Sequence, residues 1–470
     1  MLGVAGTALL FAAVDGRRPR ARVGAGMAAG LGLYGPGLWW MRDFSLPGFV
    51  AAVVVEAAIV AGAMALAAGP RGRPGWSVAS FPAAVVLAEG VRGVWPLGGL
   101  PLAGIELGQV AGPLGPAARL GGRLLVVGLV AAAGAVVATA IRRRRQGLIP
   151  AVAGLAAVAA TAIAGAVAPA GRFNAELTVA AVQGGGARGL RAVENDPTPV
   201  FDAHLRASAM VGAGADLVLW PEDVVDVEGS FSGSPEEQAL SALATELHAT
   251  LVVGIVEDVG ADHFRNASVA FAPDGRVVDR YDKVHRVPFG EYIPARSIVG
   301  RLADVSAVPR DAIAGTGPGV VDTPAGRFGV LISYEVFFAD RGRAAVRAGG
   351  RLLLVPTNAS SYRNAQVPAQ QLAVARLRAL ETGRWVVQAA PTGYSAVVDH
   401  HGRVVARSGL GGAAVLRRDV QVRTGRTVFV SLGPAPVLLA AAAVLLAAHT
   451  RRKKAARGND NFGGVVPEGR

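Results

Sequence analysis

Two hydrophobic patterns divide this chain of 470 residues. Long apolar runs stand on both sides of a more polar region, at about residues 172–427, in which short alternating runs dominate. A helix that crosses a bilayer needs about 20 mainly apolar residues. The runs of suitable length are 23–41, 48–68, 76–95, 122–141, 147–168 and 428–448, with a shorter run at 1–14. The pattern predicts a multi-pass helical membrane bundle in residues 1–170 and a C-terminal transmembrane helix at 428–448.

The basic clusters predict which side of the membrane each part occupies. "RRPRAR", "RGR", "RRRR" and "RRKK" each adjoin an apolar run, and Lys and Arg are enriched in cytoplasmic loops. Placing every cluster inside puts residues 172–427 on the outer, periplasmic side of the cell membrane and the basic tail 449–470 in the cytoplasm. The net charge of +13 therefore serves topology, and we expect no nucleic-acid partner.

The N-terminal run at 1–14 is harder to place, because this count puts its first residue outside. Either the true start lies upstream, or the run is a partial, re-entrant segment. A signal peptide is disfavoured, since no basic region precedes the run and no clear cleavage site follows it.

Composition narrows the chemistry. Hydrophobic residues make up 52% and charged residues 17% of the chain, as in a membrane protein that carries a soluble part. Cysteine is absent, which excludes disulfides, thiolate metal sites and a cysteine nucleophile. The close pair His400 and His401 falls at the tip of a hairpin pattern, where a solvated turn is expected. We expect neither a metal nor a cofactor.

One predicted pass carries charge. Glu89 and Arg92 in "LAEGVRG" lie three residues apart and thus on one helix face. A structural ion pair is favoured over a role in holding a lipid headgroup. The following stretch, "PLGGLPLAGIELGQVAGPLG", is too rich in Pro and Gly for a plain span and predicts an interfacial arm.

The extramembrane region predicts a layered α/β domain. From about residue 177, β-rich runs such as "TLVVGIVED" alternate with helical runs such as "QQLAVARLRALETG". "ASVAFAPDGRVVDRYDK" has an Asp-Gly turn between alternating runs and predicts a hairpin. Three polar residues stand where predicted strands end: Glu222 in "WPE", Lys283 in "YDKVH" and Ser333 in "LISYE". Ligand sites of α/β sheets gather at such ends, and a base, an ammonium and a hydroxyl together suit acyl transfer.

These motifs resemble a known family. "WPE", "YDKVHRVPFGEYIP" and "LISYE", in that order, resemble the Glu-Lys-Cys triad of the nitrilase superfamily. With hydrophobic passes on both sides, "VHRVPFGEYIP" resembles the membrane branch, the apolipoprotein N-acyltransferases. The resemblance covers nearly the whole chain, including "GLGLYGPGLWW" and "RLRALETGRWVVQAAPTGYSAVVD". It implies a multi-pass membrane bundle with an extracytoplasmic αββα sandwich.

The resemblance also implies a reaction and roles. An acyl chain moves from a membrane phospholipid to the enzyme and then to the amino group of a diacylated apolipoprotein, with the enzyme a monomer. Glu222 would be the general base, Lys283 would stabilise the oxyanion, and Ser333 would hold the nucleophile position. The positions matching supporting or substrate-contacting residues are Glu291, Tyr334, Glu335 and Asn358.

The chain departs from the family pattern at three points. Ser333 replaces cysteine, and a hydroxyl is far less acidic than a thiol of pKa about 8.5. The loop "GGGARGLRAVENDP" lacks the usual tryptophan, and "TNASSYRN" keeps Asn358 but lacks the acid that usually follows. Three explanations of Ser333 stay open: an active natural variant, an inactive lipid- or lipoprotein-binding variant, or a cysteine-to-serine change made to trap a substrate.

A membrane-tethered amidase of the same superfamily is the alternative enzyme, although a tether needs one helix rather than about six. Apolar loops near the site bear on this choice. Phe231 in "VEGSFSGSP" and Phe289 and Tyr292 in "VPFGEYIP" are either lids that dip into the membrane interface or residues packed on the domain.

Overall fold

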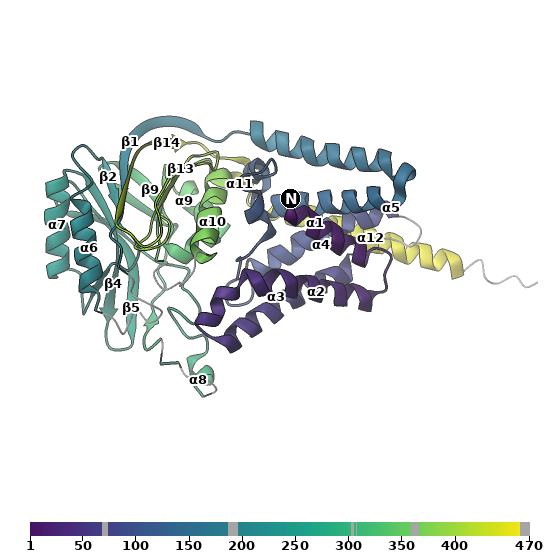
Figure 1. Cartoon of the computed structure of the whole chain (residues 1–470), viewed down its shortest axis with the longest axis horizontal. Coiled ribbons are helices and arrows are strands. Elements are labelled where there is room, and N and C mark those ends of the chain that lie inside the picture. Colours follow the sequence, from purple (N-terminus) through teal and green to yellow (C-terminus); the bar gives the residue numbers. More distant parts are fainter. Residues whose placement is uncertain (68–73, 187–195, 302–304, 307, 359–365, 461–470) are drawn as a thin grey trace, which may run out of the picture. The chain divides into compact units, whose positions relative to one another are not determined.

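The computed structural model describes all residues except 68–73, 187–195, 302–304, 307, 359–365 and 461–470. The chain forms two compact units (Figure 1). Residues 1–167 and 434–470 form a helical unit, and residues 168–433 form an α/β unit.

The helical unit contains helices at every place where an apolar run predicts one. Its elements are α1 (Leu2–Val14), α2 (Pro19–Gly37), η1 (Trp39–Asp43), α3 (Leu46–Leu66), α4 (Pro74–Arg92), η2 (Ile105–Gln109), η3 (Gly115–Ala117), α5 (Ala118–Val167) and α12 (Ala435–Asp460). Helix α5 doubles back on itself, because Gly154 packs against the side chain of Val136 and Gly165 against the backbone of Ala117. The predicted passes 122–141 and 147–168 are therefore its two antiparallel arms.

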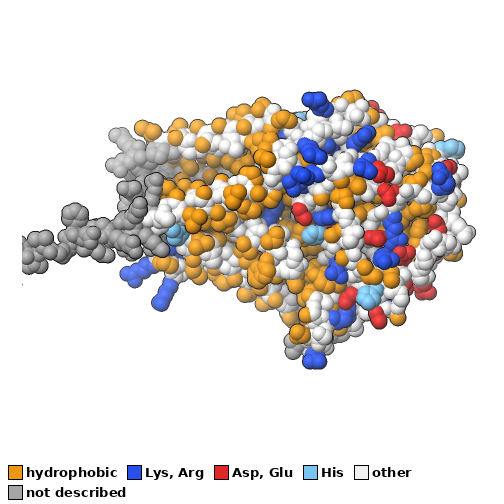
Figure 2. Space-filling model, turned by 180° about the vertical axis from the view of Figure 1, so that it is seen from behind, with side chains coloured by type: hydrophobic (Ala, Val, Ile, Leu, Met, Phe, Trp, Pro, Cys, Tyr) orange, Lys and Arg blue, Asp and Glu red, His pale blue; other side chains and the backbone are white. Residues whose placement is uncertain are grey.

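Among the described residues, two helices are long and apolar enough to cross a membrane, Leu46–Leu66 and Gly115–Arg142. Leu2–Val14, Ala151–Val167 and Ala435–Thr450 are shorter apolar helices. Hydrophobic side chains cover most of the helical unit's visible surface, whereas charged side chains gather on the α/β unit (Figure 2). The number of passes and the side on which each loop lies stay predictions.

The predicted helix 428–448 is wrong as a single element. It is divided into α11 (Val428–Leu432) and α12, which begins at Ala435. Gly433 between them has a φ of +70°, and Pro434 has no N–H to continue the helical hydrogen bonding. Helix α11 belongs to the α/β unit, whereas α12 belongs to the helical unit.

A buried set of five charged residues, here called the bundle network, joins four elements of the helical unit. Arg92 donates from Nη1 to both carboxylate oxygens of Glu89, at 2.7 and 2.8 Å, which confirms the predicted pair. Arg92 also bonds Glu56 on α3 through Nε. Arg123 on α5 donates to Glu89 at 2.9 Å and to Glu106 on η2 at 3.3 Å. Ionisable groups buried in such bundles pair with one another, as these do.

The α/β unit contains two sheets. The first has the order β14-β1-β2-β4-β5-β6, with β3 paired to β4 and β7 to β5, and the second has the order β13-β12-β11-β10-β9-β8. The strands are β1 (Arg172–Gln183), β2 (Leu217–Leu219), β3 (Val225–Val227), β4 (Thr250–Val259), β5 (His263–Phe271), β6 (Val277–Asp282), β7 (Asp311–Ala312), β8 (Val320–Thr323), β9 (Gly326–Val330), β10 (Leu353–Pro356), β11 (Val386–Ala389), β12 (Ala396–Val398), β13 (Val404–Arg407) and β14 (Ala414–Thr424).

Helices cover the outer face of each sheet. They are α6 (Thr198–Ser208), α7 (Pro235–Leu247), α8 (Arg296–Val299), η5 (Ser333–Phe337), α9 (Ala339–Arg347), α10 (Gln366–Thr382) and α11. Successive residues of β1 point to opposite faces. Ala180 and Val182 join the core under α6 and α7, whereas Val179 and Ala181 join the core between the sheets. Helices α9 and α10 contact β9 and β11 of the second sheet. The unit is therefore an αββα sandwich, as expected.

Both predicted hairpins are confirmed. Strands β5 and β6 pair antiparallel around the Asp-Gly turn, and β12 and β13 pair around the turn that carries His400 and His401. Strand β14 was not predicted, yet it pairs with β1 along almost the whole length of both strands.

Candidate active site

The three polar residues predicted at strand ends lie where the chain leaves the sheets. Glu222 follows β2, Lys283 directly follows β6, and Ser333 begins η5 after β9. The backbone N–H of Lys283 donates to the carbonyl of Asn266 on β5 at 2.9 Å, which continues the β5–β6 ladder for one more residue. The hairpin thus fixes the position of the lysine.

Four buried or half-buried side chains form what we call the lysine cluster. Lys283 Nζ lies 2.8 Å from Glu222 Oε1 and 2.7 Å from Glu291 Oε1. Asn266 Nδ2 donates to the same two oxygens, each at 2.9 Å. The backbone N–H of Val287 donates to the other oxygen of Glu291 at 2.7 Å. Among the described residues, both side-chain donors to Glu222 use Oε1, which leaves Oε2 available to accept a proton.

The charge of Lys283 is set by this cluster. Burial alone lowers the pKa of its ammonium group, but the carboxylates of Glu222 and Glu291 outweigh burial and raise the pKa above its ordinary value. Lys283 therefore stays protonated at neutral pH. It can stabilise a developing negative charge, whereas proton abstraction is left to a carboxylate.

Ser333 occupies a turn that suits a nucleophile. Its φ of +50° lies in the left-handed region, which is costly for a residue with a Cβ and is concentrated at functional sites. Gln371 Nε2 donates to Thr357 Oγ1 at 2.5 Å, and Thr357 Oγ1 lies 3.3 Å from Ser333 Oγ. Because Thr357 accepts from Gln371, its own hydrogen points to Ser333, and the hydroxyl hydrogen of Ser333 is left for a base.

Glu335 links this turn to the lysine loop. Its Oε1 accepts the backbone N–H groups of Val284 and His285, at 2.9 and 3.1 Å. Its Oε2 accepts the N–H of Ile332 at 2.9 Å. One buried carboxylate therefore binds the residue before the serine and the two residues after the lysine. The resulting distance from Ser333 Oγ to the Glu222 carboxylate stays a prediction.

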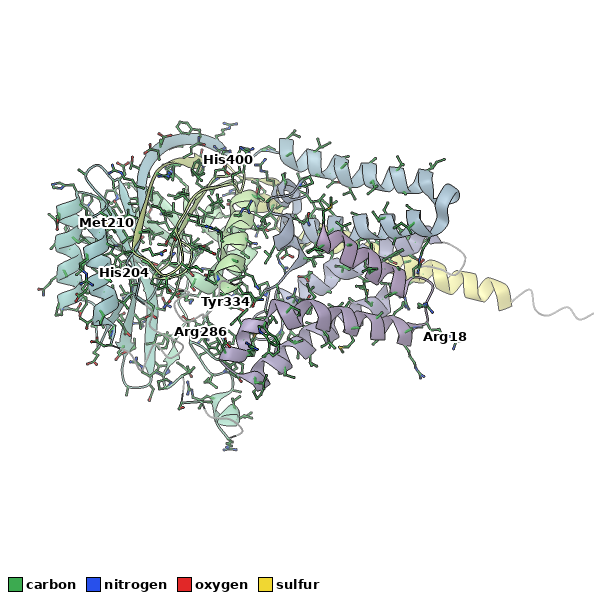
Figure 3. The ribbon with its side chains drawn as sticks, viewed as in Figure 1. Arg18, His204, Met210, Arg286, Tyr334 and His400 are labelled. Atoms are coloured by element: carbon green, nitrogen blue, oxygen red, sulfur yellow. The ribbon has the colours of Figure 1, made fainter. Side chains whose placement is uncertain are left out.

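The other expected residues lie near this region. Asn358 donates to Asp223, the neighbour of Glu222, at 3.0 Å. The ring of Tyr334 packs edge-on against Phe338 with a centroid distance of 5.0 Å. Tyr334 comes from η5 and Arg286 from the lysine loop (Figure 3). Most of the loop "GGGARGLRAVENDP" and of "TNASSYRN" lies outside the described residues.

The two apolar loops differ. Phe231 is 3% exposed and packs against Phe271 at a centroid distance of 6.3 Å, so its interpretation as a lid is wrong. Burial of the ring in the domain core outweighs any gain at an interface. Phe289 is 55% exposed and adopts a φ of +60°. Tyr292 beside it is covered by the guanidinium of Arg286 at 4.3 Å.

Three residues of the site escaped sequence reasoning: Asn266, Thr357 and Gln371. Asn266 stands in "FRNASVAF", where a polar side chain interrupts a strand pattern, and that interruption was the available signal. Thr357 and Gln371 are ordinary polar residues of a strand end and a helix. Among the described residues, no group of three or more His, Asp or Glu side chains is arranged to hold a metal.

Comparison with known families agrees with this geometry. The carbon-nitrogen hydrolase profile matches residues 178–428, and the profile of the apolipoprotein N-acyltransferase N-terminal domain matches residues 1–136. The chain belongs to the apolipoprotein N-acyltransferase branch of the carbon-nitrogen hydrolases. This membership accounts for an αββα unit and an apolar helical unit in one chain.

Individual apolipoprotein N-acyltransferases are similar over different lengths. That of Gloeobacter violaceus is 32% identical over 355 residues, which cover 73% of this chain and 66% of the relative. That of Geobacter metallireducens is 31% identical over 242 residues, which cover 51% of this chain and 46% of the relative. The chain thus spans less than two thirds of either relative. Among solved structures, Saccharomyces cerevisiae Nit3, of branch 10 of the nitrilase superfamily, is 23% identical over 53% of this chain and 91% of its own, with a TM-score of 0.41.

Proposed function

We propose that this protein is an apolipoprotein N-acyltransferase that uses Ser333 as its nucleophile. It transfers an acyl chain from a membrane phospholipid to the amino group of a diacylglyceryl-cysteine at the N-terminus of a lipoprotein. The lysine cluster carries the proposal, because it places a buried ammonium between two carboxylates in the loop that Glu335 ties to the serine turn.

In the first half-reaction, Ser333 Oγ attacks the ester carbonyl carbon of the phospholipid while Glu222 Oε2 takes the hydroxyl proton. The carbonyl oxygen becomes an oxyanion, which the Lys283 ammonium stabilises. The tetrahedral intermediate then expels the lysophospholipid oxygen, which takes the proton back from Glu222. Ser333 is left as an acyl ester.

In the second half-reaction, the neutral amine of the lipoprotein attacks the carbonyl carbon of that ester. The nitrogen loses a proton to Glu222, and the oxyanion again faces Lys283. Collapse forms the amide and expels Ser333 Oγ, which recovers the proton. Glu291 and Asn266 contribute by holding Lys283 and one oxygen of Glu222 in place.

Serine makes both steps harder than cysteine does. A hydroxyl loses its proton less readily than a thiol, and an oxygen ester gives its acyl group to an amine less readily than a thioester. This substitution favours a second candidate function, a homologue that binds lipid or lipoprotein without turnover. The family match at residues 1–136 argues against a tethered amidase, since a tether needs no such domain.

We place residues 1–170 and the C-terminal helix in the cell membrane as a multi-pass bundle. Residues 172–427 lie on the outer side and 449–470 in the cytoplasm. The absence of cysteine makes this directly testable, because one introduced cysteine is the sole thiol. A cysteine at exposed Glu236 should react with an impermeant maleimide in intact cells, whereas one at Arg18 should react after lysis. The opposite result would overturn the orientation.

The function is tested by intact mass spectrometry of the protein incubated with phospholipid, beside Ser333→Cys and Ser333→Ala. An acyl adduct on the natural chain and its absence from Ser333→Ala are expected, followed by transfer to a diacylated lipopeptide. An adduct on Ser333→Cys alone would favour the binding homologue. Absence of an adduct from both would contradict the proposed site.

A further inference from the structure

Five arginines gather around the two ends of the α/β unit. We call Arg343, Arg347, Arg384, Arg423 and Arg426 the arginine cluster. By chain connection, the first end of the unit, Ala168, directly follows helix α5, and its last residue, Gly433, stands just before helix α12. A surface that surrounds both ends is therefore continuous with the segments that lead into the apolar helices.

Two members of the cluster bridge the ends. Arg423 Nη2 donates to the carbonyls of Ala170 and Gly171, each at 3.3 Å. Arg384 Nη2 donates to the carbonyl of Gly425 at 2.7 Å. Both arginines are buried, so they form the floor of the surface.

The other three members lie over α11. Arg343 on α9 donates from Nε to the carbonyl of Val430 at 2.9 Å, and Arg347 donates to that of Ser431 at 3.2 Å. Arg426 donates to the backbone carbonyl of Arg347 at 3.2 Å. Arg347 and Arg426 are exposed and Arg343 is half-buried, so these three guanidinium groups reach solvent.

The positive charge of the cluster is not neutralised within the described part of the chain. The contacts above all go to backbone carbonyls, and none of the ion pairs among the described residues includes these five arginines. Burial and then the neighbouring Arg347 lower the pKa of Arg343. Burial and then Arg423 lower the pKa of Arg384 to about 10. Mutual repulsion of this kind is relieved by a bound anion.

Apolar side chains stand within the same segments. Leu432 at the end of α11 is 58% exposed, and Phe173 at the start of β1 is 59% exposed. Arginines beside exposed apolar side chains are typical of surfaces that lie at a membrane interface, where the guanidinium groups meet headgroups and the apolar groups enter the acyl region.

We propose that the arginine cluster binds the phosphate groups of anionic phospholipids at the bilayer surface. A guanidinium has five N–H donors in a planar fork, and one or two bonds to carbonyls leave donors for a phosphate. The inference rests on the proposed membrane location. The charge of a long extracytoplasmic domain does not oppose that location, because short loops set the orientation.

The test is native mass spectrometry of the full chain purified from an equimolar mixture of phosphatidylglycerol and phosphatidylcholine. The natural protein should retain phosphatidylglycerol about tenfold or more over phosphatidylcholine, since each arginine near the surface favours anionic lipid. Changing Arg343, Arg347 and Arg426 together to Gln should abolish the preference. Changing all three to Lys should restore part of it, because charge is kept while the fork is lost.

The matched control removes three positive charges elsewhere in the unit: Arg276, Arg296 and Arg327, each paired with an aspartate, are changed to Gln. Its lipid preference should stay at the natural value. Equal preference in the natural protein, the Gln variant and the control would overturn the proposal. So would competition by millimolar inorganic phosphate, which would indicate a site for a soluble anion. Lipid retention by Lys283→Met without acylation separates this inference from the proposed reaction.

Discussion

Two buried ionic clusters occur in this protein, one in each unit, and they differ in how the cation is held. In the bundle network, Arg92 bonds two glutamates and also donates to the carbonyls of Leu100 and Leu102, at 3.1 and 2.7 Å. The lysine cluster has a single ammonium between two carboxylates, and a neutral amide completes it.

The difference separates a structural cluster from a reactive one. The planar fork of arginine bonds several groups at once and cannot lose its proton, so it ties helices together. The point charge of lysine is shared by two oxygens, and the second oxygen of Glu222 is left for chemistry. Similar residue types thus give a fastening in one unit and a proposed catalytic site in the other.

The largest effect is expected from Lys283→Met, which removes the cation of the lysine cluster. Loss of one oxyanion donor lowers acyl transfer by about 10² to 10³, and two facing carboxylates that must share a proton add to this loss. The rate of acyl-adduct formation on Ser333, followed by intact mass, gives the result. Arg286→Met, which changes an exposed neighbour stacked on Tyr292, is the control. A decrease of less than tenfold would place the oxyanion away from Lys283.

Arg92→Met tests the other side of the comparison. Removing one partner of a buried ion pair costs about 3–5 kcal/mol of unfolding free energy, since the remaining charges stay buried. Thermal unfolding in detergent should therefore shift strongly downward. Arg42→Met removes a half-exposed arginine of the same unit and should shift the midpoint little. Equal midpoints for the two variants would show that the bundle network does not hold the helices.

Asn266→Ala asks whether the neutral member of the lysine cluster matters. Two hydrogen bonds to charged oxygens are lost, each worth about 1.5–3 kcal/mol at most, so acylation should fall about 10- to 100-fold. Asn174→Ala, at an exposed position of β1, should retain the natural rate. An unchanged rate for Asn266→Ala would mean that Lys283 alone positions Glu222.

His204 offers the smallest effect, in a buried group that has no ionic partner in either cluster. Burial lowers its pKa from 6.5 to about 4, while Nδ1 bonds the carbonyl of Val200 at 2.7 Å. The unfolded chain binds the proton more tightly, so stability is full above pH 6.5 and falls as the pH drops from 6.5 towards 4. The loss at pH 5.5 should be about 1.4 kcal/mol.

Melting temperatures at pH 7.5 and 5.5 measure this loss. His204→Gln should reduce the difference between the two pH values, whereas His248→Gln, at an exposed helix end, should leave it as it is. Equal pH dependence of His204→Gln and the natural chain would assign the acid sensitivity to other groups.

Much of the fold could be predicted because the pattern of the sequence is local. Alternation predicted both hairpins, and apolar runs predicted the helices, including both arms of α5. Strand β14 was missed because "AVLRRDVQVRT" carries charges at positions that face solvent, and its partner β1 lies far away in the sequence. The break before α12 was missed because a Gly-Pro pair within an apolar run was taken as part of a span.

The candidate site could be predicted only where a motif carried it. Glu222, Lys283 and Glu291 come together as the motifs implied. The bonds that orient them, from Asn266 and from Thr357 to Ser333, depend on contacts between distant strands and helices. Phe231 shows the same limit, since neighbouring letters do not reveal whether a loop aromatic points inward or outward.

The pairing of β1 with β14 has a consequence for the origin of this architecture. Arg172, at the start of the α/β unit, lies opposite Thr424, near its end. A domain whose termini meet in one strand pair can be inserted into a host chain, or circularly permuted, without disturbing its core. The α/β unit therefore has the geometry of a guest domain, placed between two helices of a chain that could exist without it.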